Sequence, residues 1–349
     1  LVMPSPTMMV RKQIQEVTIK QEVLVLTGVM MGGGPCHWAA EDHVKAGLPL
    51  FATPDSARTF NDDLDWVEHE MGVQLVSEEE ALKIETGTII KMKDFDFPSI
   101  SAAFQTFGVD LEPDAVAVAV FDHGAAPQGV SDRQFRFDYL QERILKENRL
   151  SAFAFQAENI PPIMTRMQSV VDSAEDLDSP LILMDTAPAA ILGAMLDPVI
   201  SNQNHLLITN VGNFHTLAFK IGPTGIEGLF EHHTGLINRS TLEGLLLALA
   251  EGSLTHEEVF DDHGHGAFIL NPTQLQLDQG NFGIVVTGPR RLMMKGSSLR
   301  PYYAVPFGDM MISGCFGLLV AVAELLPDLK DEVMSALKGN DAQRLSLIH

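Results

Sequence analysis

Five short apolar runs along the chain end in glycine or in short polar residues, and each run predicts a strand that is buried on both faces. Apolar runs without alternation are typical of the central strands of α/β sheets. They lie at Val23–Leu26, Ala115–Phe121, Leu181–Met184, Leu206–Val211 and Ile284–Val286. Because ligands bind at the carboxyl ends of such strands, a cleft is predicted where the residues after the runs converge, at Gly28–Gly34, Asp122–Gly124, Asp185, Gly212–Asn213 and Gly288.

The stretch 205–235 predicts three strands joined by two tight turns. After the strand Leu206–Val211, the dipeptide Gly212-Asn213 makes the first turn and Phe214–Ile221 forms the second strand. A second turn at residues 223–225 leads into the third strand, Ile226–His232. The Gly-Asn turn, followed by the small Thr216, leaves backbone N–H groups free to meet an anion. The alternative is an ordinary hairpin, as in any α/β protein.

Helices are predicted between these runs, and a polar acidic linker is predicted over residues 172–179. The helices are Pro35–Ala46, Pro54–Met71, Phe135–Asn148, Ala187–Leu196, Ser240–Glu251 and Gly314–Leu326. We expect an N-terminal α/β domain over residues 1–196 and a C-terminal α/β domain over 197–344. Residues 345–349 are interpreted as a non-native tail. The loop-like start at Met3–Thr7, after Leu1 instead of Met, predicts an N-terminally truncated chain.

Composition limits the classes of partner. The chain has 349 residues, 46% hydrophobic and 20% charged, which is typical of a globular protein with room for two domains. The net charge of −23 disfavours nucleic acid and anionic membranes as partners. Two cysteines make no disulfide framework and predict a reducing cytoplasm. The longest apolar run, Ile312–Ala323, is shorter than the roughly 20 residues of a bilayer span.

A glycine run follows the first strand and opens a helix. Gly32, Gly33 and Gly34 let the backbone approach a ligand, and the helix N-terminus favours an anion. The run is neither a Walker loop nor a GxGxxG fingerprint, and a tight structural turn is the alternative. Cys36 near that N-terminus would have a lowered pKa if exposed; a merely buried thiol is the other interpretation.

Polar residues after the strand Ala115–Phe121 carry candidate chemistry. Asp122 and His123 could orient water or hold a metal; an aspartate that caps the following loop is the alternative. His263 and His265 share a loop in which two imidazoles can converge, so His123, His263 and His265 are the predicted metal ligands, although no zinc-type spacing accompanies them.

The remaining histidines of the hairpin stretch are predicted to be structural. His232 and His233 are adjacent on a strand, so they should point to opposite faces. His215 shares its strand face with Leu217 and Phe219 and is interpreted as a satisfied core histidine.

The order of these elements is similar to the C-terminal half of an actin-like ATPase, a superfamily that includes sugar kinases, DnaK-type chaperones and actin. Asp185–Ala190 resembles the start of the interdomain helix, and Asn210–Thr216 resembles the second phosphate loop. Val285–Arg291 resembles the adenosine segment, and Gly314–Leu326 resembles the second connecting helix. The resemblance implies an α/β, ribonuclease H-like, two-domain fold from which the first phosphate hairpin is missing.

The segments LTGVMMGGGP, FDHG, NVGNFHTLAF and EHHTG resemble an uncharacterised prokaryotic family labelled "putative pyruvate formate-lyase activating enzyme". The chemistry of that label needs a [4Fe–4S] cluster held by three closely spaced cysteines. Cys36 and Cys315 are two and lie far apart in the sequence. We therefore expect no iron–sulfur cluster and reject that activity.

The superfamily resemblance implies a nucleotide- or phosphate-binding protein, a kinase or ATPase that uses ATP with Mg²⁺ on an unidentified small molecule. Asp122 or Asp185 would act on Mg²⁺ or water. The phosphate and nucleotide would be held by Gly32, Gly33, Gly34, Asn210, Gly212, Asn213, Thr216 and Gly288.

Two departures from the superfamily pattern weaken the case for ATP hydrolysis. Asn210 stands where an aspartate is usual, and Pro289 takes the place of a second glycine. One alternative function is a metal-dependent hydrolase that uses Asp122, His123, His263 and His265. Another is a non-catalytic regulator. The sequence does not indicate an oligomeric state.

Overall fold

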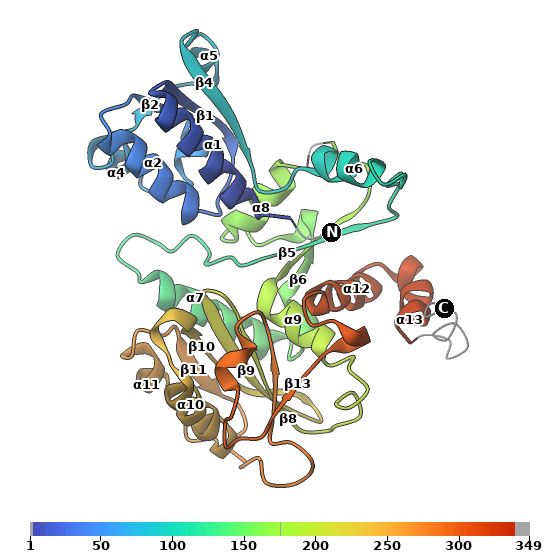
Figure 1. Ribbon diagram of the computed structural model, residues 1–349. Coiled ribbons are helices and arrows are strands. Elements are labelled where there is room, and N and C mark those ends of the chain that lie inside the picture. The colour runs from blue at the N-terminus through green and yellow to red at the C-terminus, as the bar shows by residue number, and fades with distance from the viewer. Residues whose placement is uncertain (1–2, 175, 339–349) are drawn as a thin grey trace. The chain divides into compact units, whose positions relative to one another are not determined.

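The computed structural model describes residues 3–174 and 176–338, and these residues form a mixed α/β protein with parallel and mixed sheets. Two compact units divide the chain. The first unit comprises residues 1–114 and 160–180, and the second unit comprises residues 115–159 and 181–349. Figure 1 shows the elements of both units with their labels.

The first unit is built on a parallel four-stranded sheet in the order β3-β2-β1-β4. Its strands are β1 (Val23–Val29), β2 (Leu50–Ala52), β3 (Gln74–Leu75) and β4 (Gly87–Lys93). Its helices are α1 (Pro6–Lys20), α2 (Pro35–Lys45), α3 (Pro54–Ala57), α4 (Leu64–His69), α5 (Glu78–Ala81), α6 (Phe97–Gln105) and α8 (Thr165–Asp172). Leu24 and Leu26 of β1 pack with Ile14 of α1 and Ala39 and Ala40 of α2 in one buried core.

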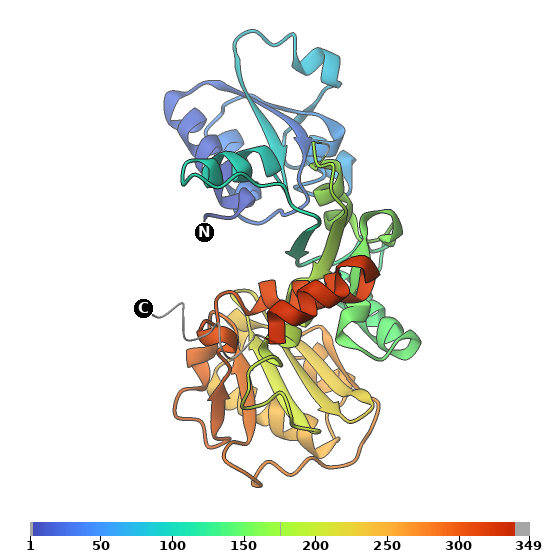
Figure 2. The same ribbon diagram turned by 90° about the vertical axis from the view of Figure 1, so that its right-hand side faces the viewer.

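The second unit contains a mixed six-stranded sheet in the order β11-β10-β9-β8-β12-β13 and a three-stranded sheet in the order β5-β7-β6. The large sheet comprises β8 (Leu206–Val211), β9 (His215–Gly222), β10 (Gly225–His233), β11 (Gly266–Ile269), β12 (Ile284–Thr287) and β13 (Pro301–Tyr303). The small sheet comprises β5 (Val116–Val120), β6 (Ala154–Gln156) and β7 (Leu181–Asp185). Figure 2 shows the large sheet from a second direction.

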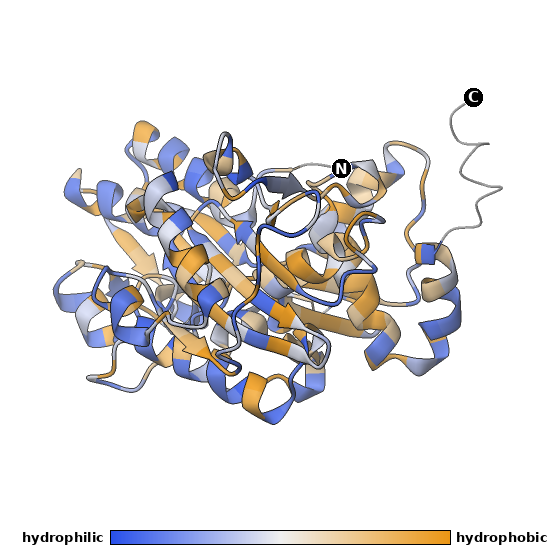
Figure 3. Ribbon diagram, turned by 90° about the horizontal axis from the view of Figure 1, so that it is seen from below, coloured by the Kyte–Doolittle hydropathy of each residue, from blue (hydrophilic) through white to orange (hydrophobic). Residues whose placement is uncertain are grey.

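The helices of the second unit are α7 (Asp132–Lys146), α9 (Thr186–Ala194), α10 (Arg239–Glu251), α11 (His256–Phe260), α12 (Ser313–Leu325) and α13 (Lys330–Lys338). Leu242, Leu246 and Leu249 of α10 pack against Leu207 and Phe230 of the large sheet. The residues of these strands are predominantly hydrophobic, whereas the helices carry both hydrophobic and hydrophilic residues (Figure 3).

Two glycines allow α9 and α12 to pack backbone to backbone. A Cβ at Gly193 would lie 1.7 Å from the carbonyl oxygen of Ser313, and one at Gly317 would lie 1.9 Å from that of Ala189. Any side chain at either position would push the helices apart. Both helices belong to the second unit, so this close packing lies within that unit.

All five apolar runs form strands, and both turns of the 205–235 stretch join antiparallel strands, as predicted. The single helix predicted over Pro54–Met71 is wrong. The chain forms α3 and α4 instead, because Asp63 caps the start of α4 by accepting a hydrogen bond from the backbone of Trp66. The Thr59 hydroxyl, which donates to the carbonyl of Met30, holds the connecting segment.

The start of the chain is also more ordered than predicted. The structure forms α1 from Pro6, because proline at the first helical position needs no N–H partner, and Val10, Ile14 and Val17 are buried. The predicted linker joins α8 to β7, with residue 175 outside the described residues, as is the predicted tail at 345–349.

The predicted domain boundary after residue 196 differs from the division into units. β5 pairs with β7 and α9 packs against α12, so residues 115–159 and 181–196 belong to the second unit. Among the described residues, no helix is both long enough and apolar enough to cross a bilayer.

Candidate functional site

Two predicted ligand loops lie side by side at one edge of the large sheet of the second unit. β8 and β12 are parallel neighbours with Asn210 opposite Thr287, so the residues after each strand meet at the same edge. The backbone N–H of Arg290 donates to the carbonyl of Val211, at 2.9 Å. Gly288 has a φ of 96°, and a Cβ there would lie 2.5 Å from that same carbonyl oxygen. The close approach of the two loops therefore requires glycine at position 288.

The turn between β8 and β9 is closed by its own backbone. The N–H of Gly212 donates to the carbonyl of His215 at 3.0 Å, whereas Asn213 and Phe214 are exposed. Thr216, predicted to face a phosphate, is fully buried, and its hydroxyl lies 2.9 Å from that of Thr234. The outward-facing residues of this turn are Asn213 and Phe214, not Thr216.

Asp122 follows β5, Asp185 ends the parallel strand β7, and both contact one buried arginine. Arg136 of α7 is 1% exposed, and its Nη1 lies 2.6 Å from Oδ2 of Asp185. The same Nη1 donates to the carbonyl of Asp122 at 3.0 Å, and Nε lies 3.2 Å from Oε2 of Glu231. Asp185 also caps α9 by accepting from the N–H of Ala187. The three carboxylate residues thus surround one guanidinium group.

Burial alone would raise the pKa of Glu231, but Arg136, His265 and His215 hold it well below its usual range. Glu231 is therefore a carboxylate inside the protein. Its second oxygen, Oε1, has no hydrogen-bond partner among the described residues.

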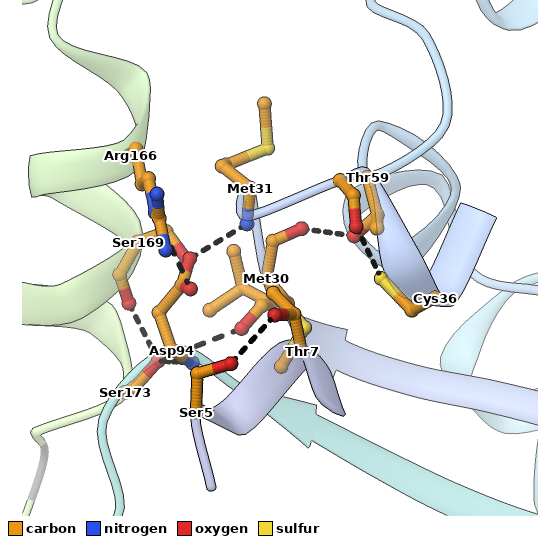
Figure 4. A network of polar contacts seen from close by, with 12 residues as sticks. Ser5, Thr7, Met30, Met31, Cys36, Thr59, Asp94, Arg166, Ser169 and Ser173 are labelled. Carbon is orange, nitrogen blue, oxygen red and sulfur yellow. Dashed lines mark hydrogen bonds and ion pairs between the residues drawn. The ribbon is translucent and has the colours of Figure 1, made fainter. Parts of the chain in front are cut away.

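The glycine run of the first unit is held by a polar cluster around Asp94, shown in Figure 4. Oδ2 of Asp94 accepts from the N–H of Met31 at 2.7 Å and from the hydroxyl of Ser169 at 2.8 Å. Oδ1 lies 3.7 Å from Nε of Arg166, and the hydroxyl of Ser173 accepts from the N–H of Asp94. We call Met31, Asp94, Arg166, Ser169 and Ser173 the Asp94 cluster.

Gly32 and Gly34 meet different constraints. A Cβ at Gly32 would lie 2.6 Å from Cγ2 of Thr7, so close packing requires this glycine. Gly34 precedes α2 with a φ of 44°, and nothing lies within 4 Å of where its Cβ would be. The thiol of Cys36 donates to the carbonyl of Gly33. Burial raises the pKa of this thiol to about 12, so the structure supports the buried thiol over the alternative of a lowered pKa.

Four imidazoles gather in the second unit, and we call His123, His215, His233 and His265 the histidine cluster. His215 begins β9 and lies directly opposite His233 at the end of β10. His265 precedes β11, and its backbone N–H donates to the carbonyl of Glu231. The ligand atoms of His215, His233 and His265 all lie within 4.8 Å of one another. The ring of His123 lies 5.3 Å from that of His215 and 5.6 Å from that of His265.

Two predictions about the histidines are corrected by this geometry. His263 is exposed with a φ of 64° and lies outside the group, so the loop 261–266 contributes one imidazole and not two. His215 is not a satisfied core histidine: its Nδ1 lies 3.3 Å from Oε1 of Glu231 but makes no hydrogen bond with it. His232 points away from the cluster, with Nε2 3.4 Å from Oδ2 of Asp262, so the opposite faces of His232 and His233 are confirmed.

Burial and neighbouring charges keep His123, His233 and His265 unprotonated by lowering their pKa values. They lower the pKa of His123 and of His233 to about 4 and that of His265 to about 3. These three imidazoles are neutral near pH 7, which is the form that binds metals.

A family model described as "Putative pyruvate format-lyase activating enzyme (DUF1786)" matches residues 31–293. No curated protein and no solved structure matches the chain significantly. The cysteines do not fit the cluster chemistry of that description. Cys36 lies buried in the first unit as a hydrogen-bonded thiol, and Cys315 is exposed in the second. These two residues do not supply the three cysteine ligands of an activating-enzyme cluster.

Proposed function

The chain belongs to the DUF1786 family, and we propose that it is a nucleotide- or phosphate-binding protein of actin-like ATPase type. In this proposal ATP with Mg²⁺ is the ligand, the activity is that of a kinase or ATPase, and the fold is the two-domain, ribonuclease H-like one. The family description itself supports no activity, because the chain's cysteines do not fit it.

The proposal is carried by the pair of loops after β8 and β12. Parallel strands of α/β sheets place ligands at their carboxyl ends, and both loops lie at that edge, joined by the hydrogen bond from Arg290 to Val211. Exposed Asn213 and Phe214 stand at the tip of one loop, and Arg290 and Arg291 stand in the other. Backbone N–H groups and guanidinium groups together recognise phosphate oxygens.

The two candidate acids are buried, whereas the loops after β8 and β12 carry exposed residues. Asp122 and Asp185 are each 2% exposed, and Asp185 is paired with Arg136. We keep both as the candidate acids of a phosphoryl-transfer step, and the first test therefore measures ligand binding and not turnover. We also propose a cytoplasmic location, because two cysteines provide no disulfide framework.

The test compares two arginines at opposite ends of one strand. Arg290 follows β12, whereas Arg300 bonds to Gly283 just before β12 begins. We expect Arg290→Gln to weaken the binding of Mg-ATP about tenfold, because one charge-assisted hydrogen bond is lost. Arg300→Gln is the matched control and should bind as the parent does, as measured by calorimetry.

No binding by the parent protein, or equal affinities for the two variants, would overturn the proposal. Binding without any phosphate release would favour a non-catalytic regulator over an ATPase.

A further inference from the structure

We propose that His215, His233 and His265 form a binding site for a divalent transition-metal ion of the zinc class. This site is separate from the phosphate-binding proposal and stands on the geometry of the second unit alone. His215 and His233 lie on β9 and β10, and His265 directly precedes β11; these three strands are neighbours in the sheet (Figure 1).

The spacing of the three imidazoles suits one ion. The ring centres of His215 and His233 are 4.9 Å apart, those of His215 and His265 are 5.0 Å apart, and those of His233 and His265 are 4.7 Å apart. Zinc binds histidine nitrogen at about 2.0–2.1 Å, so two nitrogens on a tetrahedral ion lie about 3.4 Å apart. Because the ligand atoms already lie within 4.8 Å of one another, small rotations of the rings complete the set.

Buried histidine nitrogens that lack hydrogen-bond partners among the described residues indicate that a ligand binds in the histidine cluster. His265 is fully buried, yet neither Nδ1 nor Nε2 has a hydrogen-bond partner among the described residues. Nδ1 of His215 and Nδ1 of His123 also lack such partners. Buried polar groups are almost always hydrogen-bonded, since leaving them unpaired costs stability. A metal ion would take one of the two nitrogens of His265 as a ligand.

The carboxylate of Glu231 lies next to His215, where it can orient the imidazole ring for a metal ion. Metal-bound histidines usually donate their second nitrogen to a carboxylate or carbonyl group, which fixes the ring. Oε1 of Glu231 lies 3.3 Å from Nδ1 of His215, and Arg136 holds the other oxygen of Glu231. This arrangement leaves Nε2 of His215 as the atom for the metal.

The donor set narrows the class of ion. Three imidazoles without a thiolate suit zinc, copper, nickel or iron, and they disfavour calcium and magnesium, which prefer oxygen. Three protein ligands also leave one coordination position open, as in catalytic zinc sites. His123 lies beside His215 and His265 but outside the set of three, facing that group.

The experiment compares two histidines of one loop: His265 is buried in the proposed site, and His263 is exposed outside it. The purified chain is stripped with a chelator and titrated with Zn²⁺ against a chromophoric competitor. We expect one zinc ion per chain for the parent and for His263→Asn, since His263 is exposed and outside the site. His265→Asn should weaken zinc binding more than about 100-fold, beyond the loss typical of a residue that only orients a ligand.

A second variant keeps the test decisive if His265→Asn does not fold. His233 is partly buried at the end of β10, and His233→Gln should also lose zinc while retaining the circular dichroism spectrum of the parent. The proposal is overturned if the parent binds no zinc. It is equally overturned if folded His265→Asn, or folded His233→Gln, binds zinc as tightly as His263→Asn does.

Discussion

The Asp94 cluster and the histidine cluster are both buried groups of polar side chains, but they differ in how their polar atoms are satisfied. Asp94 accepts hydrogen bonds from Met31 and Ser169, and Ser173 bonds to its backbone. In the histidine cluster, both nitrogens of His265 lack a partner within the described part of the chain. Both oxygens of Asp94 therefore have protein partners, whereas neither nitrogen of His265 has one among the described residues.

This difference separates a structural role from a binding role. The Asp94 cluster ties the glycine run after β1 to α8, which explains the precise placement of that run without any bound anion. The histidine cluster is supported by Arg136 and Glu231, but within the described residues neither nitrogen of His265 has a hydrogen-bond partner. A buried cluster whose donors and acceptors do not pair is the stronger candidate for a ligand site.

We expect the largest loss of stability when Arg136, which pairs with Glu231 next to the histidine cluster, is replaced. Arg136→Met should lower the free energy of unfolding by about 3–5 kcal/mol, because Asp185 and Glu231 would remain buried without their cation. Urea denaturation measures the change. Arg149→Met is the control, since Arg149 makes exposed ion pairs worth less than about 1 kcal/mol.

Arg136→Lys keeps the charge and should lose less stability than Arg136→Met. If the methionine variant folds with a loss below about 1 kcal/mol, Asp185 and Glu231 do not depend on Arg136 and this description of their support is wrong.

We expect an intermediate loss of stability when Asp94 is replaced. Asp94→Asn should cost about 1–3 kcal/mol, because an NH₂ group would replace an oxygen that accepts or faces a cation. Zinc affinity should not change. Asp96→Asn is the matched control: Asp96 caps α6, and asparagine caps helices equally well. Equal melting temperatures for the two variants would argue against the closed network at Asp94.

We expect the smallest effect from ionisation of the Cys36 thiol, which changes stability only at high pH and not near pH 7. The folded thiol keeps its proton up to about pH 12, whereas the unfolded thiol ionises near its ordinary value of 9.0. Stability from this group is therefore fully present below pH 9 and is lost as pH rises above it. At pH 8, iodoacetamide should modify exposed Cys315 and spare Cys36, and both should react in urea. Modification of Cys36 at the rate of Cys315 in the folded chain would contradict its burial.

Most of the fold can be predicted from local pattern. Apolar runs, turn residues and helix caps identify β1, β5, β7, β8 and β12, together with α2, α9 and α12. The failures have local causes that periodicity does not reveal. One apolar period runs through residues 54–71, but Asp63 starts a new helix there. The pairing of β5 with β7 is a long-range contact, so the division into units did not follow the order of the sequence.

The histidine cluster was predicted only in part, because one β-bulge changes the pairing of a hairpin. Counting outward from the turn between Gly222 and Gly225 places His215 opposite His232. The register shifts by one residue between Ile226 and Gly228, and His215 then faces His233. Hairpin counting with an allowed bulge could have found this pair. The roles of Arg136 and Glu231 carried no sequence signal, since they depend on helix α7 reaching the sheet.

X-ray absorption at the zinc edge of the metal-loaded chain tests the histidine cluster most directly. We expect a first shell of nitrogen and oxygen at about 2.0–2.1 Å with outer scattering from about three imidazoles. Loading of the His263→Asn variant should leave this spectrum unchanged. A shell containing sulfur at about 2.3 Å, or oxygen without imidazole scattering, would contradict the assignment of His215, His233 and His265 as the ligands.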